Sequence, residues 1–534
     1  MTAAISTRAA RVWQGAWVDV TVGTRLLGGL VALASAALVL AGQYRPVEQS
    51  PLLGLAVGMV AAAAAALAGY LVIVRPWWGL LAWLALMPVM NAARAQLYLG
   101  PVQLIATTPG ALGLVLGTAI WRGRLAPAER PNVPAVAWGL LAVAAALAVV
   151  ATVAAPISSE SINITLHGVL VPFAVFGAVL AMRPDPRAVV QAVAALAFGI
   201  ISAAMVNLAY LFGTIGPSSF YERRFLYARL TYFNTGIFGG MLVAGMVHLC
   251  VVLIARARMG WSRCVAPVTW GAMAIAVVAV FFTYTKSAWV AGAVGLSLVA
   301  LLLVRGWKRR VAALAATYAL LAVVVPFPRG ALSVVSPALS DAYYDFVVSL
   351  QSEERVESWD PVSESGRGSV GIRFVALSAS AELAARHPLL GVGPGRFADV
   401  FPEVRPNADV PNLQSAHNFL PNLAVEYGLP LMAIVLVTFG VAVLLALPWM
   451  ESGDELGRVA AVGVAIAIVA WNTFGAAFGV DLYRPFRTMN ADVIQIAVLT
   501  ALGVSLGLLG RERGLTWRRR ADAEAEAEGR VGSA

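Results

Sequence analysis

The chain has 534 residues, of which 60% are hydrophobic and 12% are charged, with a formal net charge of +10. Because about 25% of an ordinary soluble domain is charged, this composition excludes a soluble fold. The basic residues are scattered between apolar runs and do not form one patch, which argues against nucleic-acid binding and is typical of topology signals.

Apolar runs of spanning length recur from near residue 23 to near residue 510. Since a transmembrane helix needs about 20 apolar residues, these runs predict an all-α polytopic membrane protein with about 12–14 transmembrane helices. The count is a range because the segments near 77–93 and 101–121 are weak. They contain Pro88, Asn91 and Pro109 and could form a re-entrant pair.

Five parts follow from the order of these runs. We expect a cytoplasmic N-terminal segment at 1–22, helices 1–11 within 23–326, a large extracytoplasmic loop at 327–416, three last helices within 417–511 and a charged cytoplasmic tail at 512–534. Lys and Arg concentrate in the segments that lie on the same side of the membrane as the N-terminus, which is the positive-inside pattern. It places both termini in the cytoplasm of a multi-pass inner-membrane protein.

The large loop contains one periodic stretch. Apolar residues recur at helical spacing between Ile372 and Ala384 and predict an amphipathic helix on the membrane surface. His387-Pro388 ends this stretch, and Leu-Leu-Gly-Val-Gly-Pro-Gly follows at 389–395. Its glycines, Gly393 and Gly395 among them, predict a turn with backbone angles and close approaches that side chains forbid.

Several cations are expected near the outer ends of spans or in the large loop, among them Arg229, Lys286 and Arg373. A charge drawn into hydrocarbon is costly unless it is paired or solvated, and guanidinium groups bind phosphate oxygens through two N–H groups at once. The pattern therefore predicts a basic vestibule for a diphosphate. The alternative is that most of these cations snorkel to the interface or pair with local carboxylates.

His417 stands where the large loop meets the next apolar run. Imidazole accepts a proton near neutral pH, so this side chain could deprotonate an acceptor hydroxyl. The alternative is that His417 and Asn418 cap the helix that follows. The chain has no His-Glu-x-x-His, Cys-x-x-Cys, Walker or Asp-x-Asp motif, so we predict no cofactor and no metal. If a diphosphate is the substrate, cationic side chains must do the work of an ion.

Motifs of the large loop and of the start of the next apolar run together resemble the signature region of the O-antigen ligase and O-antigen polymerase family. They are Gly371-Ile-Arg373, His387-Pro388-Leu-Leu-Gly-Val-Gly-Pro-Gly395, His417-Asn418 and Glu426-Tyr-Gly-Leu429. Arg229-Leu-Thr-Tyr-Phe-Asn234 and Thr285-Lys286-Ser-Ala-Trp289 are similar to two further segments of the family, with Lys286 in place of the usual Arg. The resemblance extends over about residues 200–450.

This resemblance implies an activity. Members of the family transfer a glycan from an undecaprenyl-diphosphate carrier to a hydroxyl of a glycan, lipid or protein acceptor at the outer face of the cytoplasmic membrane. They resemble metal-independent inverting enzymes of the multi-span, GT-C-like glycosyltransferase class. Carried over to this chain, the resemblance implies that Arg229, Arg373 and Lys286 bind the diphosphate and that His417 is catalytic. Asn418, Gly393, Gly395 and Glu426 would support them.

Other functions stay open at this point. The sequence does not separate a ligase from a polymerase, and transfer to protein by an O-oligosaccharyltransferase is a further possibility. A transporter or flippase of lipid-linked sugars would also span the membrane many times, but it would carry charges within its spans and inverted halves. Here the expected midplanes are nearly free of charge, which favours the enzyme. The expected partners are the lipid-linked donor, the acceptor and membrane lipids, with no nucleic acid.

Overall fold

A computed structural model describes residues 75–97, 108–125, 133–214, 235–283, 286–322, 369–405, 412–413, 415–416, 418–478 and 491–515. At some helix ends, including residues 286–287 and 369–374, only the backbone is described. The described residues form helices and no strands. The helices are α4 (Pro76–Leu97), α6 (Thr108–Arg124), α7 (Ala135–Ala154), α8 (Ser159–Thr165), η3 (Leu166–Leu170), α9 (Val171–Met182), α10 (Pro186–Thr214), α12 (Thr235–Ala255), α13 (Val265–Thr283), α14 (Lys286–Leu298), η4 (Val299–Leu303), α15 (Trp307–Ala322), α18 (Ser369–Arg386), α19 (Phe397–Val400), η6 (Phe401–Glu403), α20 (Phe419–Tyr427), α21 (Leu429–Leu444), α22 (Leu447–Met450), α23 (Glu455–Phe478) and α24 (Ala491–Glu512).

The described helices are those of a membrane protein. Six stretches, each within one helix or formed by consecutive helices, are long and apolar enough to span a bilayer: Ala135–Ala154, Ser159–Met182, Pro186–Val206, Leu429–Met450, Glu455–Thr473 and Ile494–Glu512. Three shorter apolar helices lie at Gly239–Ala255, Val265–Val280 and Ala288–Leu303. The expected fold class, an all-α polytopic membrane protein, is confirmed.

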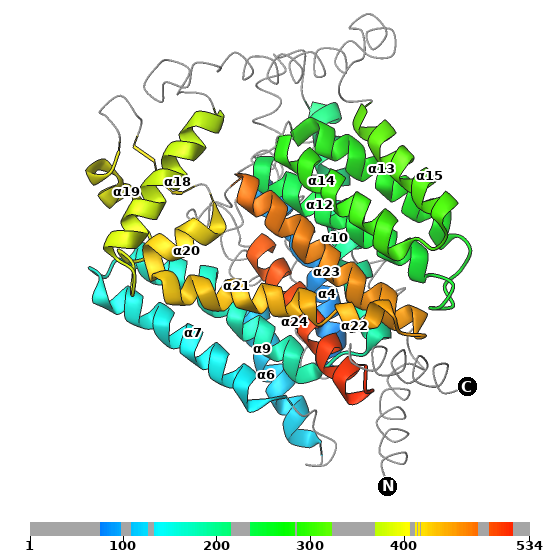
Figure 1. Cartoon of the computed structure of the whole chain (residues 1–534), viewed down its shortest axis with the longest axis horizontal. Coiled ribbons are helices and arrows are strands. Elements are labelled where there is room, and N and C mark those ends of the chain that lie inside the picture. The colour runs from blue at the N-terminus through cyan, green and yellow to red at the C-terminus, as the bar shows by residue number, and fades with distance from the viewer. Residues whose placement is uncertain are drawn as a thin grey trace, which may run out of the picture.

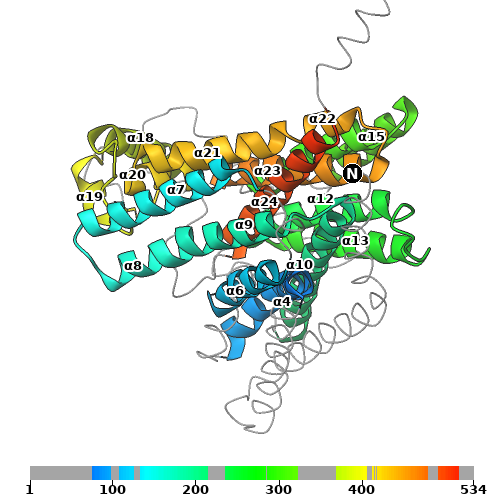
Figure 2. The same ribbon diagram turned by 90° about the horizontal axis from the view of Figure 1, so that it is seen from below.

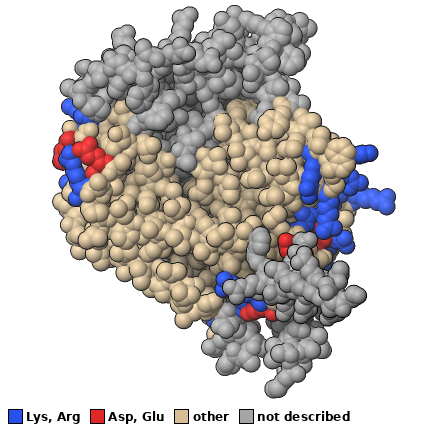
Figure 3. All heavy atoms as spheres, in the orientation of Figure 1, with Lys and Arg blue, Asp and Glu red and all other residues tan. Residues whose placement is uncertain are grey.

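The outer surface of the bundle shows where the hydrocarbon lies. In α7, only 22% of the most apolar stretch is buried inside the protein. The same fraction is buried in the most apolar stretch of Leu429–Met450. Exposed side chains such as Val143, Val149 and Val153 on α7 suit contact with lipid. Figure 3 shows charged atoms at opposite ends of the visible face and a band between them that lacks them. Helices α7 and α21 run along this band (Figure 1).

The interior is packed around α10, which contacts α4 and α12, while α24 packs against α9 and α21. Gly199 of α10 allows the close approach of α4, because a Cβ at this position would lie 2.6 Å from the carbonyl oxygen of Ala85. Gly503 and Gly507 of α24 lie against Ala442 and Leu445. Their Gly-x-Ser-x-Gly sequence is therefore a helix-packing motif in which small residues let helices approach closely.

A buried arginine secures the end of the bundle where α14 and α23 meet. Arg458 is 5% exposed, and its guanidinium donates to the carbonyl oxygens of Leu302 and Leu303 at 2.7 and 3.1 Å. These are the last carbonyls of η4, which have no partner within their own helix. Glu455 lies 2.8 Å from the same guanidinium and balances its charge.

The predicted helix in the large loop is present as α18, at the edge of the bundle beside α20 (Figure 1). The expectation that it lies on the membrane surface is wrong, because its apolar face is buried against protein. Val375, Ala379 and Leu383 pack in a small second core with Phe397, Phe401 and Val425. The large loop is thus attached to the transmembrane bundle through a core of its own.

The apolar run after His417 also differs from expectation. Its length predicts one helix from about residue 418 to 447, whereas the structure has α20 and α21, separated at Gly428. Gly428 adopts φ 87°, and a Cβ here would lie 2.2 Å from the carbonyl oxygen of Leu389. The break exists because the loop packs directly on this glycine, a contact that local sequence does not reveal.

Other predicted segments lie outside the described residues. They are the N-terminal segment 1–22, the first apolar runs up to residue 74, most of the first half of the large loop and the end of the tail from residue 516. The count of 12–14 spans and the five-part division therefore stay predictions.

Candidate functional site

The turn after α18 is built from glycines. Gly391, Gly393 and Gly395 have φ values of 68°, 100° and 77°, in the region that only glycine adopts without strain. Each also lies where a Cβ would collide: Gly391 against the backbone of Val425 and Glu426, Gly393 against Ala155, and Gly395 against Ile164. The predicted close approaches are confirmed, and they are made to α20, to the end of α7 and to α8.

Backbone hydrogen bonds fasten this turn to the end of α20. The amide of Val392 donates to the carbonyl of Val425 at 2.8 Å, and that of Gly393 donates to the carbonyl of Glu426 at 3.2 Å. The amide of Leu429, beyond the break, donates to the carbonyl of Pro388 at 2.8 Å. The turn and α20 therefore form one unit.

Glu426 is a carboxylic acid inside this unit. Its side chain is fully buried, and its Oε2 accepts a hydrogen bond from the amide of Gly395 at 2.9 Å. Burial raises the pKa of Glu426 well above its ordinary value, and the nearby Glu160 carboxylate acts in the same direction. The amides of Gly395 and Phe397 lower the pKa but do not outweigh burial. The geometry thus favours the protonated acid.

Tyr427, the next residue, connects the unit to the membrane helices. Its hydroxyl lies 3.1 Å from the hydroxyl of Thr165 at the end of α8, which in turn lies 2.6 Å from the hydroxyl of Thr152 on α7. All three hydroxyl groups are buried, so each needs a partner inside the protein. This chain of hydrogen bonds fixes α20 relative to α7 and α8.

The start of α20 is equally well anchored. The side chain of Asn418 accepts a hydrogen bond from the amide of Leu420 at 3.2 Å and caps the helix. The amide of Ala416 donates to Oδ1 of Asn422 at 2.7 Å. Phe419 packs against Phe439 and Trp471, with ring centroids 6.3 and 5.8 Å apart. The residues on both sides of position 417 are therefore fixed.

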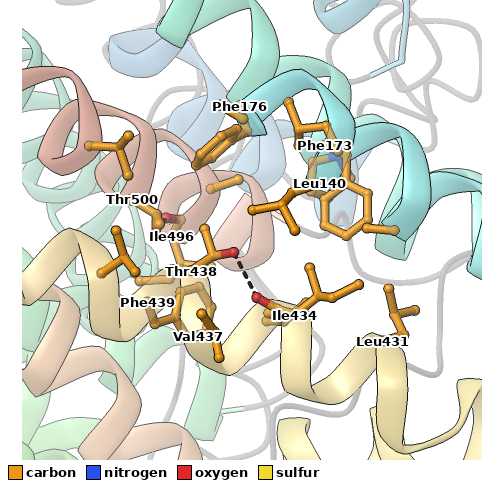
Figure 4. Close-up of a pocket in the computed structure, with 18 of the residues that line it drawn as sticks. Leu140, Phe173, Phe176, Leu431, Ile434, Val437, Thr438, Phe439, Ile496 and Thr500 are labelled. Atoms are coloured by element: carbon orange, nitrogen blue, oxygen red, sulfur yellow. Dashed lines mark hydrogen bonds between the residues drawn. The ribbon is translucent and has the colours of Figure 1, made fainter. Parts of the chain in front are cut away.

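An apolar groove of about 290 Å³ begins at α20 and runs between α7, α9, α21 and α24 (Figure 4). Phe419 and Leu423 line one end, and Arg511 lines the other. Along α24 it extends from Ile496 to Arg511, which is fifteen helical steps or about 22 Å.

The groove offers little to a polar ligand. Its hydroxyls on Thr438 and Thr500 donate to the carbonyls of Ile434 and Ile496 in their own helices, at 2.7 and 2.6 Å. Figure 4 shows Leu140 and Phe173 across the groove from Leu431 and Ile434. Its walls therefore suit an extended hydrocarbon chain.

Comparison with known protein families matches residues 271–436 to the family described as O-antigen ligase. These residues belong to the O-antigen ligase family. The match confirms the resemblance seen in the sequence motifs. Comparison with curated proteins finds no match.

The O-antigen ligase segment contains most of the predicted site residues. Asn418, Gly393, Gly395 and Glu426 lie together in and around α20, as described above. Lys286 is the first residue of α14, and Arg373 lies in the first turns of α18, where the side chains are not described. His417 and Arg229 lie outside the described residues, so the predicted roles of all four stay predictions.

Some residues of the site could not be recognised as site residues from the sequence. Thr165, Glu160 and Asn422 contact the O-antigen ligase signature or support it, yet Thr165 stands 262 positions from its partner Tyr427. Within the described ranges, no group of three or more His, Cys, Asp or Glu side chains is placed to hold a metal ion. The polar contact between Thr165 and Tyr427 joins α8 to α20.

Asn422→Ala is expected to lower the free energy of unfolding by about 1–3 kcal/mol, because the buried amide of Ala416 loses its acceptor. It should also lower the rate of any reaction that uses position 417. Melting temperature in detergent measures the first effect. The control is Asn472→Ala, since the Asn472 side chain donates to the carbonyl oxygen of Ile468 in its own helix, at 2.8 Å. Equal losses in both variants would contradict the anchoring role of Asn422.

Proposed function

We propose that this protein is a glycosyltransferase that moves a glycan from an undecaprenyl-diphosphate carrier to an acceptor hydroxyl at the outer face of the cytoplasmic membrane. The observation that carries the proposal is the O-antigen ligase match over residues 271–436, which includes Lys286, Arg373 and His417. Around position 417 the chain is held on both sides by the contacts of Asn418 and Asn422. Such support suits a group that must be oriented for proton transfer.

The proposed reaction is a single displacement at the anomeric carbon of the donor glycan. The acceptor oxygen forms a bond to this carbon as the bond to the diphosphate oxygen breaks, and attack from the opposite face inverts the configuration. His417 takes the proton from the acceptor hydroxyl. Arg229, Arg373 and Lys286 stabilise the negative charge that builds up on the leaving undecaprenyl diphosphate. In this proposal no metal ion takes part.

The apolar groove supports a lipid-linked donor. A polyprenyl chain is long, carries only methyl branches and has no polar groups, and the walls between α7, α21 and α24 are mainly apolar. Because the groove begins beside Phe419, a chain with its diphosphate at that end would present it near the start of α20. The energy of burying this chain would hold the donor at the site.

The test uses purified protein, an undecaprenyl-diphosphate-linked oligosaccharide and candidate acceptors. His417→Ala and Arg373→Ala are expected to lower the rate of glycan transfer by about 100-fold or more, because each removes a group that acts in the transition state. Matched controls are His387→Ala and Arg386→Ala, which alter an exposed histidine and an exposed arginine paired with Glu382 on the same helix. Both controls should keep the wild-type rate.

Three results would count against the proposal. A wild-type rate of glycan transfer in His417→Ala and Arg373→Ala would contradict the catalytic role of His417 and the diphosphate-binding role of Arg373. Loss of activity with a chelator, restored by a divalent ion, would contradict the metal-free mechanism. Movement of the donor across a vesicle membrane without transfer to any acceptor would indicate a flippase. Comparison of the donor's own glycan, a lipid core and a protein as acceptors distinguishes a polymerase, a ligase and an O-oligosaccharyltransferase.

A further inference from the structure

Two exposed leucines adjoin where the glycine turn meets the start of α21. Leu389, in the turn, is 70% exposed, and Leu429, the first residue of α21, is 40% exposed. Their backbones are in contact, because the amide of Leu429 donates to the carbonyl oxygen of Pro388 at 2.8 Å. A Cβ on Gly428 would lie 2.2 Å from the carbonyl oxygen of Leu389. Leu389 and Leu429, called the turn patch below, thus bring apolar surface to one end of α21.

The turn patch continues into an exposed stripe along α21. This stripe recurs every three or four residues and so occupies one face of the helix; it consists of Leu429, Ala433, Leu436, Gly440 and Leu444. The apolar groove of Figure 4 is lined by other residues of α21. Exposed apolar side chains on a helix of spanning length suit contact with lipid. The face that meets lipid therefore extends up to Leu429.

The length of this span places Leu429 at a boundary of the hydrocarbon. The stretch Leu429–Met450 has 22 residues, or about 33 Å at the helical rise, and the hydrocarbon core of a bilayer is about 30 Å thick. A charged residue, Glu451, follows this stretch directly. Figure 2 shows α18 and α20 at one end of α21 and α22 at the other. The turn patch thus lies at the level where hydrocarbon meets headgroups.

A second helix gives the same boundary. Val153, near the end of α7, is 63% exposed, and Ile157, just after the helix, is 60% exposed. The exposed polar residues 158–160 follow directly. Gly393 of the glycine turn lies against Ala155, within this transition from apolar to polar surface. The apolar surface of α7 therefore also ends at the level of the turn.

We propose that Leu389 and Leu429 insert into the lipid leaflet on this side of the bundle and hold the glycine turn at its surface. The two side chains contact acyl chains, and the exposed His387 keeps its polar ring among the headgroups. Removal of the leucines from water supplies the favourable free energy. The continuity of the turn patch with the stripe on α21 favours lipid over a protein partner. This contact does not depend on the proposed transfer reaction.

The test is spin labelling of the purified full chain in phosphatidylcholine vesicles. Cys250→Ala and Cys264→Ser remove the two native thiols. Single cysteines are then introduced as Leu389→Cys, as Leu436→Cys on the stripe, and as Ser378→Cys on the exposed face of α18. Collisions of each label with molecular oxygen, which dissolves in hydrocarbon, are compared with collisions with a water-soluble nickel chelate.

The label in Leu389→Cys is expected to show an oxygen-to-nickel collision ratio close to that of Leu436→Cys and severalfold above that of Ser378→Cys. A ratio equal to that of Ser378→Cys would show that the turn patch lies in water and would overturn the proposal. Low collision rates with both reagents would show a protein partner over the patch and would also overturn it. All three positions are exposed, so each variant should melt at the temperature of the cysteine-free chain.

Discussion

Gly391→Ala is expected to lower the free energy of unfolding by about 3–4 kcal/mol. An alanine at φ 68° costs about 1–2 kcal/mol by itself. Its Cβ would lie 2.4 Å from the carbonyl oxygen of Val425 and from the carbonyl carbon of Glu426. These are backbone atoms and cannot rotate away, so the turn must move off α20 and lose hydrogen bonds from Val392 and Gly393.

The melting temperature in detergent micelles measures this effect, and glycan transfer by the surviving folded protein measures its consequence. The control is Gly440→Ala in α21, where a Cβ meets no atom within 4 Å. Because glycine in a helix interior is unfavourable, this variant should gain about 0.5–1 kcal/mol. If the melting temperature of Gly391→Ala equalled that of wild type, the turn would not be fastened to α20 as described.

The helices of the fold were predictable because their signals are local. Spanning segments are visible in windows of about 20 residues, and the buried face of α18 follows from the spacing of Val375, Ala379 and Leu383. The glycine turn was also predictable, since few other functions require Gly391, Gly393 and Gly395 so close together. In each case the relevant residues are neighbours in sequence.

The contacts that build the site were not predictable in the same way. The apolar face of α18 packs against Phe397, Phe401 and Val425, which stand at irregular intervals after it in the sequence. Tyr427 bonds to Thr165, 262 residues earlier, and nothing in either local sequence indicates the other. The break at Gly428 arises from contact with Leu389 across the turn. Such features depend on the packing of whole helices.

The free energy of unfolding is expected to depend on pH through Glu426. Its pKa in the folded protein lies well above the ordinary value of 4.5 because the side chain is buried. In the unfolded chain it ionises near that ordinary value. Between the two pKa values the folded state holds a proton that the unfolded state has lost. Stability is therefore expected to fall as pH rises through this window, with a slope of up to about 1.4 kcal/mol per pH unit.

Glu426→Gln should remove this slope. Glutamine cannot ionise, its carbonyl oxygen can accept the hydrogen bond from Gly395, and its shape is close to that of the protonated acid. The variant should thus gain stability relative to wild type as pH rises above about 4.5. Glu426→Ala should be about 2–4 kcal/mol less stable than Glu426→Gln, because it leaves a cavity and removes the acceptor of the buried Gly395 amide.

Melting temperatures of wild type and the two variants, measured from pH 4.5 to 9, distinguish a protonated acid from a buried anion. An anion held by the amides of Gly395 and Phe397 would have a pKa below the ordinary value, and wild type would then lose stability as pH falls. Glu382→Gln, on the exposed side of α18, is the control and should show no such change. The protonated acid also has a structural consequence: a neutral Glu426 can lie beside Glu160 without repulsion, so α20 and α8 can stay packed while Tyr427 bonds to Thr165.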